Sequence, residues 1–242
     1  MPCRGCGKGA PRGSRGLNRK VIETMKIHTV FITYNRLELT KRAIKSYFET
    51  VTVPHTVVVV DNASHDGTQD WLNSQFLAGH LNEIILLDEN KYPGYACNRG
   101  WSLAPDDATH LHRADNDFIF LPGWVDEVAK RFARPDAGQV GLRTAEEELF
   151  TLQNVGGNCM ISREIWDEGL RYDETPWTEY PAGFTEDSYF SPEVKRRGYM
   201  WFRVRKPCIE AISSEDPDDP YYQQTWADRR IGPPNGGDRR LE

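Results

Sequence analysis

The apolar residues of this chain gather in short runs that are separated by stretches with helical spacing. The runs rich in apolar and β-branched residues cover residues 27–33, 56–60, 83–87 and 109–114. Runs of this length are typical of strands buried on both sides of a sheet. The stretches between them, with apolar residues at helical spacing, cover residues 37–49, 66–76 and 94–103. Strands and helices that alternate through short links predict an α/β fold, with a mostly parallel sheet sandwiched by helices.

The second half of the chain has a less regular pattern. Pro122 opens a helix that extends to about Phe132, because proline is favoured at the first helical position. Pro192 is expected to kink or delay a helix over residues 185–197, since proline lacks the backbone N–H. The other predicted elements are a strand over 155–162, a short helix over 162–168 and a strand over 199–205. We therefore expect a smaller second region beside the main sheet.

The two ends of the chain differ from its middle. Residues 1–24 begin with a stretch that holds six Lys or Arg residues up to Lys20 and no acidic residue, which predicts a basic flexible arm. Asp, Pro, Gly and Arg dominate residues 213–242, which predicts an extended or partly disordered tail. A single domain is expected over residues 25–212, divided into halves 25–117 and 118–212.

Composition narrows the class of protein. Hydrophobic residues make up 38% of the 242 residues, enough for the core of one sizeable α/β domain, and the net charge of −6 excludes a generic polyanion binder. The sequence predicts no bilayer-spanning helix and no secretory signal, because it has no run of 18 apolar residues and no apolar leader. The five scattered cysteines are typical of reduced thiols in a cytoplasmic protein. No pattern predicts an oligomeric state.

Polar residues follow four of the predicted strands. They are Thr33-Tyr34-Asn35, Asp61-Asn62-Ala63-Ser64, the loop from Asp88 to Gly94, and Asp115-Asn116-Asp117. Ligands of open α/β sheets bind beyond the carboxyl ends of the strands, so these segments predict a ligand site. A single strand-end Asp is as readily a cap for the next helix. The recurrence at successive strand ends favours the functional interpretation.

Three acidic residues are candidates for the chemistry. Asp115 and Asp117 lie one residue apart and predict a site for Mn²⁺ or Mg²⁺, whose preferred ligands are such oxygens together with substrate phosphates. The alternative is an Asx turn that uses the same side chains locally. Asp187 begins a predicted helix, where a carboxylate can act as a general base. Its alternative role is to stabilise the positive end of the helix macrodipole.

The loop at residues 90–100 joins a strand to a helix. Gly94 would let the backbone approach a phosphate at the helix start, and Arg99 would contact that phosphate. The segment matches neither the P-loop nor the dinucleotide-binding glycine pattern, which counts against ordinary nucleotide hydrolases and dehydrogenases. His110 and His112 alternate on the strand before the acidic triplet, either as ligands or, more commonly for a strand, as structural residues.

These pieces, in this order, resemble family 2 glycosyltransferases of the GT-A fold. The matching stretches are Val30–Arg36, Val58–Thr68, Asn90–Gly100, Ala114–Asp117, Gly156–Arg163, Tyr172–Glu174 and Thr185–Asp187. The resemblance extends from about Lys26 to Arg205, and its first two stretches together are quite specific. It implies that residues 25–117 form the nucleotide-sugar half of the domain and residues 118–212 the acceptor half.

The resemblance also implies roles for individual residues. Asp117 would be the main metal ligand, Asp115 would contact the ribose or the metal shell, and Asp187 would be the catalytic base with Glu186 beside it. The donor-binding residues that it implies are Thr33, Tyr34, Asn35, Asp61, Asn62, Gly94, Arg99, Asp115, Gly156 and Gly157. Three aromatic residues would lie where acceptors enter, namely Trp177, Tyr180 and Phe184, although core packing explains such rings equally well.

The expected activity is a metal-assisted, inverting transfer of a sugar from a nucleoside-diphosphate sugar to an acceptor hydroxyl. A UDP- or dTDP-type donor is favoured, because Asp61 would fit uracil or thymine better than a purine. The Q-x-x-R-W element of processive members is absent, which favours a non-processive enzyme. The acceptor would be a glycan, a lipid-linked sugar or a small molecule. The basic arm raises an alternative acceptor, a modified base of DNA, through contacts with phosphates.

Two other classes of protein stay open. A nucleotidyltransferase would need a glycine-rich triphosphate loop after the first strand, and Thr33-Tyr34-Asn35-Arg36 contains no glycine. A non-catalytic nucleotide-sugar-binding module would not need Asp61, Asp117 and Asp187 together. Both classes are therefore less well supported than a glycosyltransferase.

Overall fold

A mixed sheet lies at the centre of the computed structural model, which describes residues 19–147, 154–181 and 184–213. Its strands within these ranges are β1 (Ile27–Thr33), β2 (His55–Asp61), β3 (Glu83–Leu86), β4 (His110–Asp115), β6 (Ala137–Gly141), β7 (Cys159–Ser162) and β8 (Met200–Arg203). They are arranged in the order β3-β2-β1-β4-β7-β6-β8, and only β7 is antiparallel to its neighbours. The expected mostly parallel sheet is confirmed.

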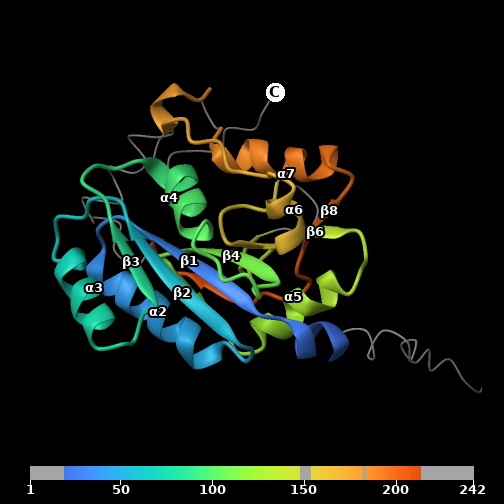
Figure 1. The fold of residues 1–242 in the computed structure, drawn as a ribbon, viewed down its shortest axis with the longest axis horizontal. Coiled ribbons are helices and arrows are strands. Elements are labelled where there is room, and N and C mark those ends of the chain that lie inside the picture. The colour runs from blue at the N-terminus through green and yellow to red at the C-terminus, as the bar shows by residue number, and fades with distance from the viewer. Residues whose placement is uncertain (1–18, 148–153, 182–183, 214–242) are drawn as a thin grey trace, which may run out of the picture.

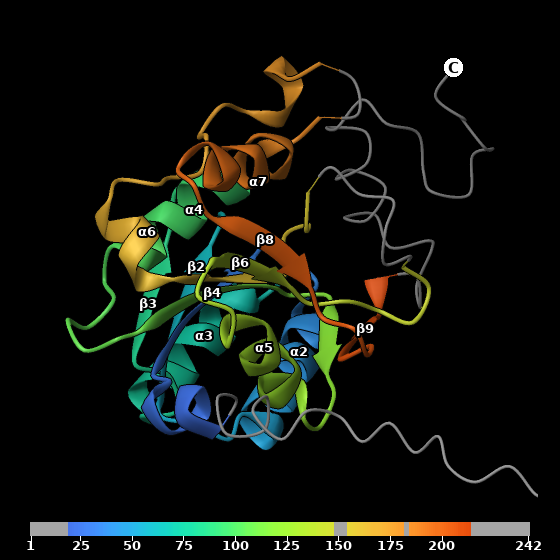
Figure 2. The ribbon, with the colours of Figure 1, turned by 90° about the vertical axis from the view of Figure 1, so that its right-hand side faces the viewer.

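Helices cover both faces of this sheet (Figure 1 and Figure 2). The described helices are α2 (Leu37–Thr50), α3 (Thr68–Leu77), α4 (Tyr92–Trp101), α5 (Trp124–Phe132), α6 (Arg163–Asp167), α7 (Glu186–Arg196) and a 3-10 turn, η1 (Trp177–Glu179). One face carries α4, α6 and α7, and the opposite face carries α2, α3 and α5. This is the sandwich that the alternating pattern predicts.

Strand β2 has four consecutive valines, which pack on both faces of the sheet. Val57 and Val59 belong to the core on the α2 side, which also contains Leu72. Val58 and Val60 belong to the second core on the α4 side. Because successive side chains of a strand point to opposite faces, a strand in a sheet covered on both sides buries its side chains in both cores, which favours apolar residues.

The two strand histidines have different surroundings, and His112 is structural. Its ring is fully buried and stacks on Trp124 and Tyr47, with centroids 5.2 and 6.0 Å away, while its Nδ1 lies 3.2 Å from the hydroxyl of Thr29. Burial lowers the pKa of His112 to about 3, so the ring is neutral at ordinary pH. His110 packs edge-on against Phe132, with ring centroids 4.5 Å apart. Both rings therefore take part in packing.

Several elements differ from the expectation. A second, two-stranded antiparallel sheet forms from β5 (Phe118–Phe120) and β9 (Ile209–Ala211). Helix α7 includes Pro192 within its continuous length. Residues 19–24 form a helix, so including them in a flexible arm was wrong; Val21 and Ile22 pack against the core and hold it. The remaining arm residues 1–18 and the tail from residue 214 lie outside the described part.

In the described ranges, no helix is long and apolar enough to cross a membrane. Three cysteines within these ranges are buried free thiols, namely Cys97, Cys159 and Cys208, whereas Cys3 and Cys6 lie outside the described part.

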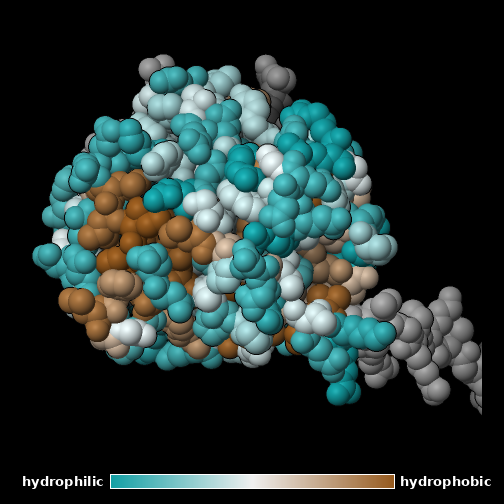
Figure 3. All heavy atoms as spheres, viewed as in Figure 1, coloured by the Kyte–Doolittle hydropathy of each residue, from teal (hydrophilic) through white to brown (hydrophobic). Residues whose placement is uncertain are grey.

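Strand β3 forms one edge of the central sheet and packs near α3. Ile84, Ile85 and Leu86 are half-buried, and Leu77 at the end of α3 is 83% exposed. Figure 3 shows hydrophobic surface on this side of the molecule, at the left of the view. The β3 edge is therefore less completely covered than the centre of the sheet.

Helix α3 offers a matched test of the core. Leu72 is fully buried under the sheet, whereas Leu77 on the same helix is exposed. Leu72→Ala should lower the free energy of unfolding by about 2–5 kcal/mol, because it leaves a cavity. Leu77→Ala should change it by less than about 0.5 kcal/mol. Urea denaturation of both variants measures the difference, and equal losses would contradict this packing.

Candidate active site

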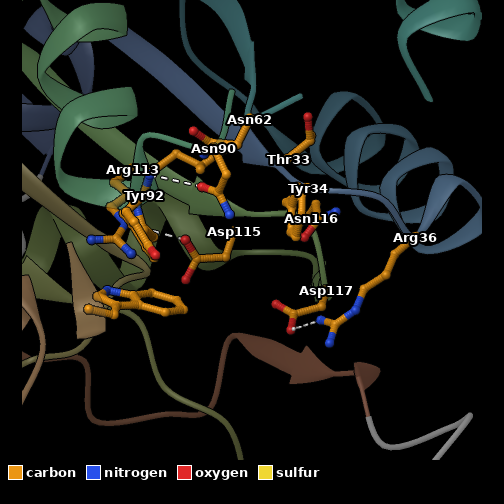
Figure 4. Close-up of a pocket in the computed structure, with 13 residues that line it drawn as sticks. Thr33, Tyr34, Arg36, Asn62, Asn90, Tyr92, Arg113, Asp115, Asn116 and Asp117 are labelled. Atoms are coloured by element: carbon orange, nitrogen blue, oxygen red, sulfur yellow. Dashed lines mark hydrogen bonds and ion pairs between the residues drawn. The ribbon is translucent and has the colours of Figure 1, made fainter. Parts of the chain in front are cut away.

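A pocket opens where β1, β2 and β4 end. The strands run parallel in register, with Thr33 beside Asp61 and Ile32 beside Asp115, so their carboxyl ends lie at one edge of the sheet. The residues that line the pocket are Ile32, Thr33, Tyr34, Arg36, Asn62, Asn90, Tyr92, Pro93, Arg113, Asp115, Asn116, Asp117 and Trp177. Figure 4 shows these side chains around the pocket. We call the part lined by Arg36, Arg113, Asp115 and Asp117 the pocket floor. The predicted ligand site thus coincides with a pocket.

The loops around the pocket contain unusual backbone. Four described residues other than glycine have positive φ, namely Asn35 (55°), Arg36 (63°), Ala63 (62°) and Tyr92 (64°). Asn35, Arg36 and Ala63 lie in the loops that follow β1 and β2, and Tyr92 is the first residue of α4, after β3. Such conformations cost free energy and persist where surrounding contacts enforce them, often at functional sites.

Hydrogen bonds between the first two loops supply that enforcement. The Asn35 N–H donates to the hydroxyl of Ser64 at 2.6 Å, and the His65 N–H donates to Oδ1 of Asn35 at 2.7 Å. The Leu37 N–H donates to Oδ2 of Asp66 at 2.8 Å. Because each bond joins the β1–α2 loop to the β2–α3 loop, the pocket wall is held in shape from two strands.

Each of the two expected metal carboxylates has an arginine partner in this structure. Nη1 of Arg36 lies 3.1 Å from Oδ2 of Asp117, and these side chains are 8% and 19% exposed. Nε of Arg113 lies 3.2 Å from Oδ1 of Asp115. Figure 4 shows the Arg36–Asp117 pair on the opposite side of the pocket from Arg113 and Asp115. Each of the two carboxylates is therefore paired with a positive charge.

Arg113 also contacts the acidic pair at the start of α7. Its Nη1 lies 3.0 Å from Oδ1 of Asp187 and 2.8 Å from Oε1 of Glu186. Burial alone would lower the pKa of Arg113, but the charges of Asp187, Asp115 and Glu186 together raise it above the usual value. The Arg113 guanidinium therefore stays charged and connects the predicted base to the predicted donor carboxylate.

Glu186 and Asp187 both lie in the first turn of α7, but their side chains have different surroundings. Thr185 caps the helix through a reciprocal hydrogen-bond pair with Ser188. The Glu186 side chain is 2% exposed, and its Oε2 accepts a hydrogen bond of 2.6 Å from Nε1 of Trp177. The Asp187 side chain is 16% exposed. Glu186 therefore anchors Arg113 and Trp177, while Asp187 is the more accessible carboxylate.

The structure places Asp61 beneath the pocket, outside its lining. Asp61 is fully buried, and its oxygens accept hydrogen bonds from the Thr33 hydroxyl at 2.8 Å, from Nε2 of Gln69 at 2.9 Å, and from the N–H and hydroxyl of Ser64. Its neighbour Asn62 lines the pocket. The Asp61 carboxylate is therefore engaged in fixing the strand ends.

The residues after β3 that line the pocket are not the two expected there, Gly94 and Arg99. A Cβ on Gly94 would lie 2.0 Å from the carbonyl oxygen of Asp173, so this glycine permits close packing between α4 and the 173 segment. Arg99 is exposed in the last turn of α4 and does not line the pocket. Asn90, Tyr92 and Pro93 line it instead.

Gly157 lies against the donor carboxylate Asp115, and Gly156 lies near the side chain of Arg203. Gly156 has a φ of 76°, which glycine adopts without strain. A Cβ on Gly157 would lie 2.5 Å from Oδ2 of Asp115 and 2.9 Å from Nη2 of Arg113. Asn158, the next residue, accepts a hydrogen bond of 3.1 Å from the Asp115 N–H. The two glycines therefore allow the segment before β7 to support Asp115.

The three aromatic residues predicted on the acceptor side lie in two different places. Trp177 lines the pocket, with its ring centroid 5.8 Å from that of Tyr92. Tyr180 and Phe184 instead pack around Tyr189 of α7, at centroid distances of 5.5 and 6.0 Å. Phe184 is 44% exposed. Only Trp177 of the three is part of the pocket lining.

A hard divalent cation fits the pocket floor in its donor chemistry. Within the described ranges, no group of three or more His, Cys, Asp or Glu side chains comes together as a metal cage. Asp115 and Asp117 supply two carboxylates, and Mg²⁺ commonly binds through one or two carboxylates plus phosphates and water. The residues present therefore fit a metal shared with a diphosphate.

The sequence interpretation missed Arg36 and Arg113. Arg113 had a detectable signal, because it is the one charged residue within the stretch 109–114, which is predicted to be a strand. A charged residue in a strand buried on both faces is rarely found without a specific partner. Arg36 was within the quoted motif, and nothing in its spacing marks it as the partner of a carboxylate 81 residues later.

The sequence matches the family model described as glycosyl transferase family 2 over residues 29–189. Because this match covers more than half of the chain, the protein belongs to glycosyl transferase family 2. It is 24% identical over 208 residues to the uncharacterized glycosyltransferase YwdF of Bacillus subtilis (strain 168), covering 78% of this chain and 74% of that protein. The chain is thus a glycosyltransferase.

Solved structures have the same GT-A fold. The mannosyltransferase PcManGT from Pyrobaculum calidifontis, in complex with GDP-Man and Mn²⁺, superimposes with a TM-score of 0.64 at 19% identity, covering 90% of this chain and 69% of that one. Residues 1–349 of S. aureus TarS superimpose with a TM-score of 0.61 at 16% identity, covering 84% of this chain. This chain spans 64% of that TarS fragment. TarS has also been solved in complex with UDP-GlcNAc.

Asp61 and Asn62 provide a test of which residue faces the nucleotide. Asp61→Asn should lower the free energy of unfolding by at least about 2 kcal/mol, because a charged acceptor of buried hydrogen bonds is lost. Asn62→Ala should weaken nucleotide binding and cost about 0.5–1.5 kcal/mol of stability, because the Lys91 N–H loses its hydrogen bond to Oδ1 of Asn62. Urea denaturation and calorimetric titration with UDP separate the effects. A stable Asp61→Asn protein that loses UDP would support a contact between Asp61 and the nucleotide base.

Proposed function

We propose that this protein is an inverting, non-processive glycosyltransferase that moves a sugar from a nucleoside-diphosphate sugar to an acceptor hydroxyl. One observation carries the proposal. Asp115 and Asp117, at and just after the end of β4, line the pocket together with Arg113. The Arg113 guanidinium contacts Asp115 and also Asp187 at the start of α7, which lies outside the pocket lining. A single-displacement transfer needs such a combination, with a charged donor site beside a general base.

The geometry supports separate places for the nucleoside, the diphosphate and the base. Thr33, Tyr34 and Asn62 line the strand ends where a nucleoside would lie, and Asp115 and Asp117 mark the diphosphate end. Asp187 takes the proton of the acceptor hydroxyl as its oxygen attacks the anomeric carbon. The bond from that carbon to the diphosphate oxygen breaks, so the configuration of the sugar inverts.

The charged groups of the floor match the charge that develops on the leaving diphosphate. Arg36 supplies hydrogen-bond donors there. Mn²⁺ or Mg²⁺ bound by Asp117 and Asp115 would neutralise that charge as a Lewis acid. The Mn²⁺ in the PcManGT complex supports this assignment by likeness of fold.

The substrates are the finer part of the proposal. The preference for a UDP- or dTDP-type donor depended on Asp61, which is buried, so a thermal-shift panel must include guanine and adenine nucleotide sugars. TarS and PcManGT were solved with UDP-GlcNAc and GDP-Man, respectively. We propose a hydroxyl of a glycan, lipid-linked sugar or small molecule as the acceptor. The DNA alternative depends on the basic arm, whose residues 1–18 lie outside the described part.

Asp187→Ala tests the proposed base. This variant should bind donor normally and turn over at least about 100-fold more slowly, because a positioned base typically contributes 10²–10⁴-fold. Glu193→Ala, on the same helix and away from the pocket lining, should keep full activity. Release of nucleoside diphosphate measures turnover, and NMR of the product reports the anomeric configuration. Near-normal turnover of Asp187→Ala, or retention of configuration, contradicts the proposed mechanism.

Asp117→Asn tests the metal assignment without an activity readout. Losing one anionic oxygen should weaken Mn²⁺ binding at least about 10-fold, the lower end of what even an outer-shell substitution costs. Calorimetric titration of Mn²⁺ into the UDP-bound protein measures this affinity. Asp126→Asn, an exposed acid of α5, is the matched control and should leave the affinity unchanged. Equal affinities for both variants would remove Asp117 from the metal site.

A further inference from the structure

Arg113 is buried and has several acidic partners, unlike an arginine in a surface ion pair. Its side chain is 3% exposed, and three carboxylates surround it, those of Asp115, Glu186 and Asp187 at 3.2, 2.8 and 3.0 Å. Asp115 belongs to β4, whereas Glu186 and Asp187 belong to α7. The guanidinium therefore forms a bridge between the central sheet and the helix that carries the proposed base.

The bridge is held on a rigid support. The Arg113 guanidinium carbon lies 5.1 Å from the ring centroid of Tyr172, and this ring stacks on Phe190 of α7 at 3.8 Å. The backbone of Tyr172 exchanges hydrogen bonds of 2.9 Å with the side chain of Asn98 in α4. Because Gly157 has no Cβ, the segment before β7 can also approach the Arg113 guanidinium closely. Such a support keeps Arg113 in one position.

The three carboxylates are not equivalent. Glu186 is 2% exposed, so Arg113 and Glu186 form a buried ion pair. Asp115 and Asp187 are 27% and 16% exposed. Each of these accessible carboxylates has its own proposed task, one toward the donor and one toward the acceptor. Their shared contact with Arg113 therefore goes beyond what stabilising the fold requires.

We propose that Arg113 is a positioning residue that holds Asp187 in place as the base by tying it to the donor carboxylate Asp115. This inference rests on the proposed function, because it takes Asp187 as the base. Occupation of Asp115 by the donor changes the charge that Arg113 faces, and Arg113 passes that change to Asp187. The reaction is thereby prepared on the acceptor side when the donor is bound.

Arg113→Lys separates the bridge from the charge. A lysine ammonium is a compact point charge and lacks the planar fork with which arginine contacts several oxygens in fixed directions. The variant keeps the positive charge near Glu186 and loses the simultaneous contact with Asp115 and Asp187. We expect kcat to fall roughly 100-fold, the scale of a small misplacement of a reacting group, while the Kd for UDP changes less than threefold.

A double-mutant cycle distinguishes positioning from a general structural role. Arg113→Lys is made in the wild-type protein and in Asp187→Ala, and product formation is followed in single turnovers with radiolabelled donor. The factor of roughly 100 should shrink to less than about twofold in the Asp187→Ala background, because residues that act as one unit are not additive. Arg36→Lys is the matched control, since it pairs with Asp117. Its cost should be the same in both backgrounds.

The possible results are distinct. Equal costs of Arg113→Lys in the two backgrounds would overturn the positioning role and leave the proposed function standing. Normal turnover of Asp187→Ala alone would overturn both proposals. If Arg113→Lys does not fold, as thermal denaturation would report, Asp115→Asn replaces it, because it removes the donor end of the bridge and keeps the Arg113–Glu186 pair. Its kcat loss should likewise shrink in Asp187→Ala, and an undiminished loss overturns the positioning role.

Discussion

The burial of the Arg113 guanidinium is the interaction on which the two halves of the domain depend. Removing a cation from water costs several kcal/mol, and the cost is offset only if partners of opposite charge surround it. The partners come from β4 itself and from the first turn of α7. The helix start must therefore lie over the end of the strand. The capping box at Thr185 and the Glu186–Trp177 hydrogen bond then follow as supports of that placement.

The parallel sheet supplies the second constraint. Since both of its faces are covered, polar side chains that must meet water can gather only at strand ends. The backbone there has positive φ at Asn35, Arg36, Ala63 and Tyr92, at the edge of the pocket. Hydrogen bonds from Asn35 to the next loop hold this backbone in place. The pocket is thus preformed at the carboxyl ends of the strands, as ligand sites usually are.

Sequence reasoning located what local pattern determines. Apolar and β-branched runs predicted β1 and β2, because a strand buried on both faces is usually rich in such residues. It missed β6, whose five residues include two glycines and which is a strand because β7 and β8 pair with it on either side. The resemblance assigned Asp61 to the nucleotide, whereas the hydrogen bonds that its buried carboxylate accepts from Thr33 of β1 and Gln69 of α3 form only in the folded domain. Tertiary partners decide such roles.

The arrangement of charge on the pocket floor has a consequence for how a donor enters. Arg36 pairs with Asp117 and Arg113 with Asp115, so the two carboxylates suited to a cation are already partly neutralised. A bare divalent cation would have to compete with these guanidinium groups. A diphosphate offers Arg36 a new anionic partner and also brings ligands for the cation. The floor is therefore better matched to a cation and diphosphate arriving together than to either alone, and Arg113 is the group through which that exchange would reach α7.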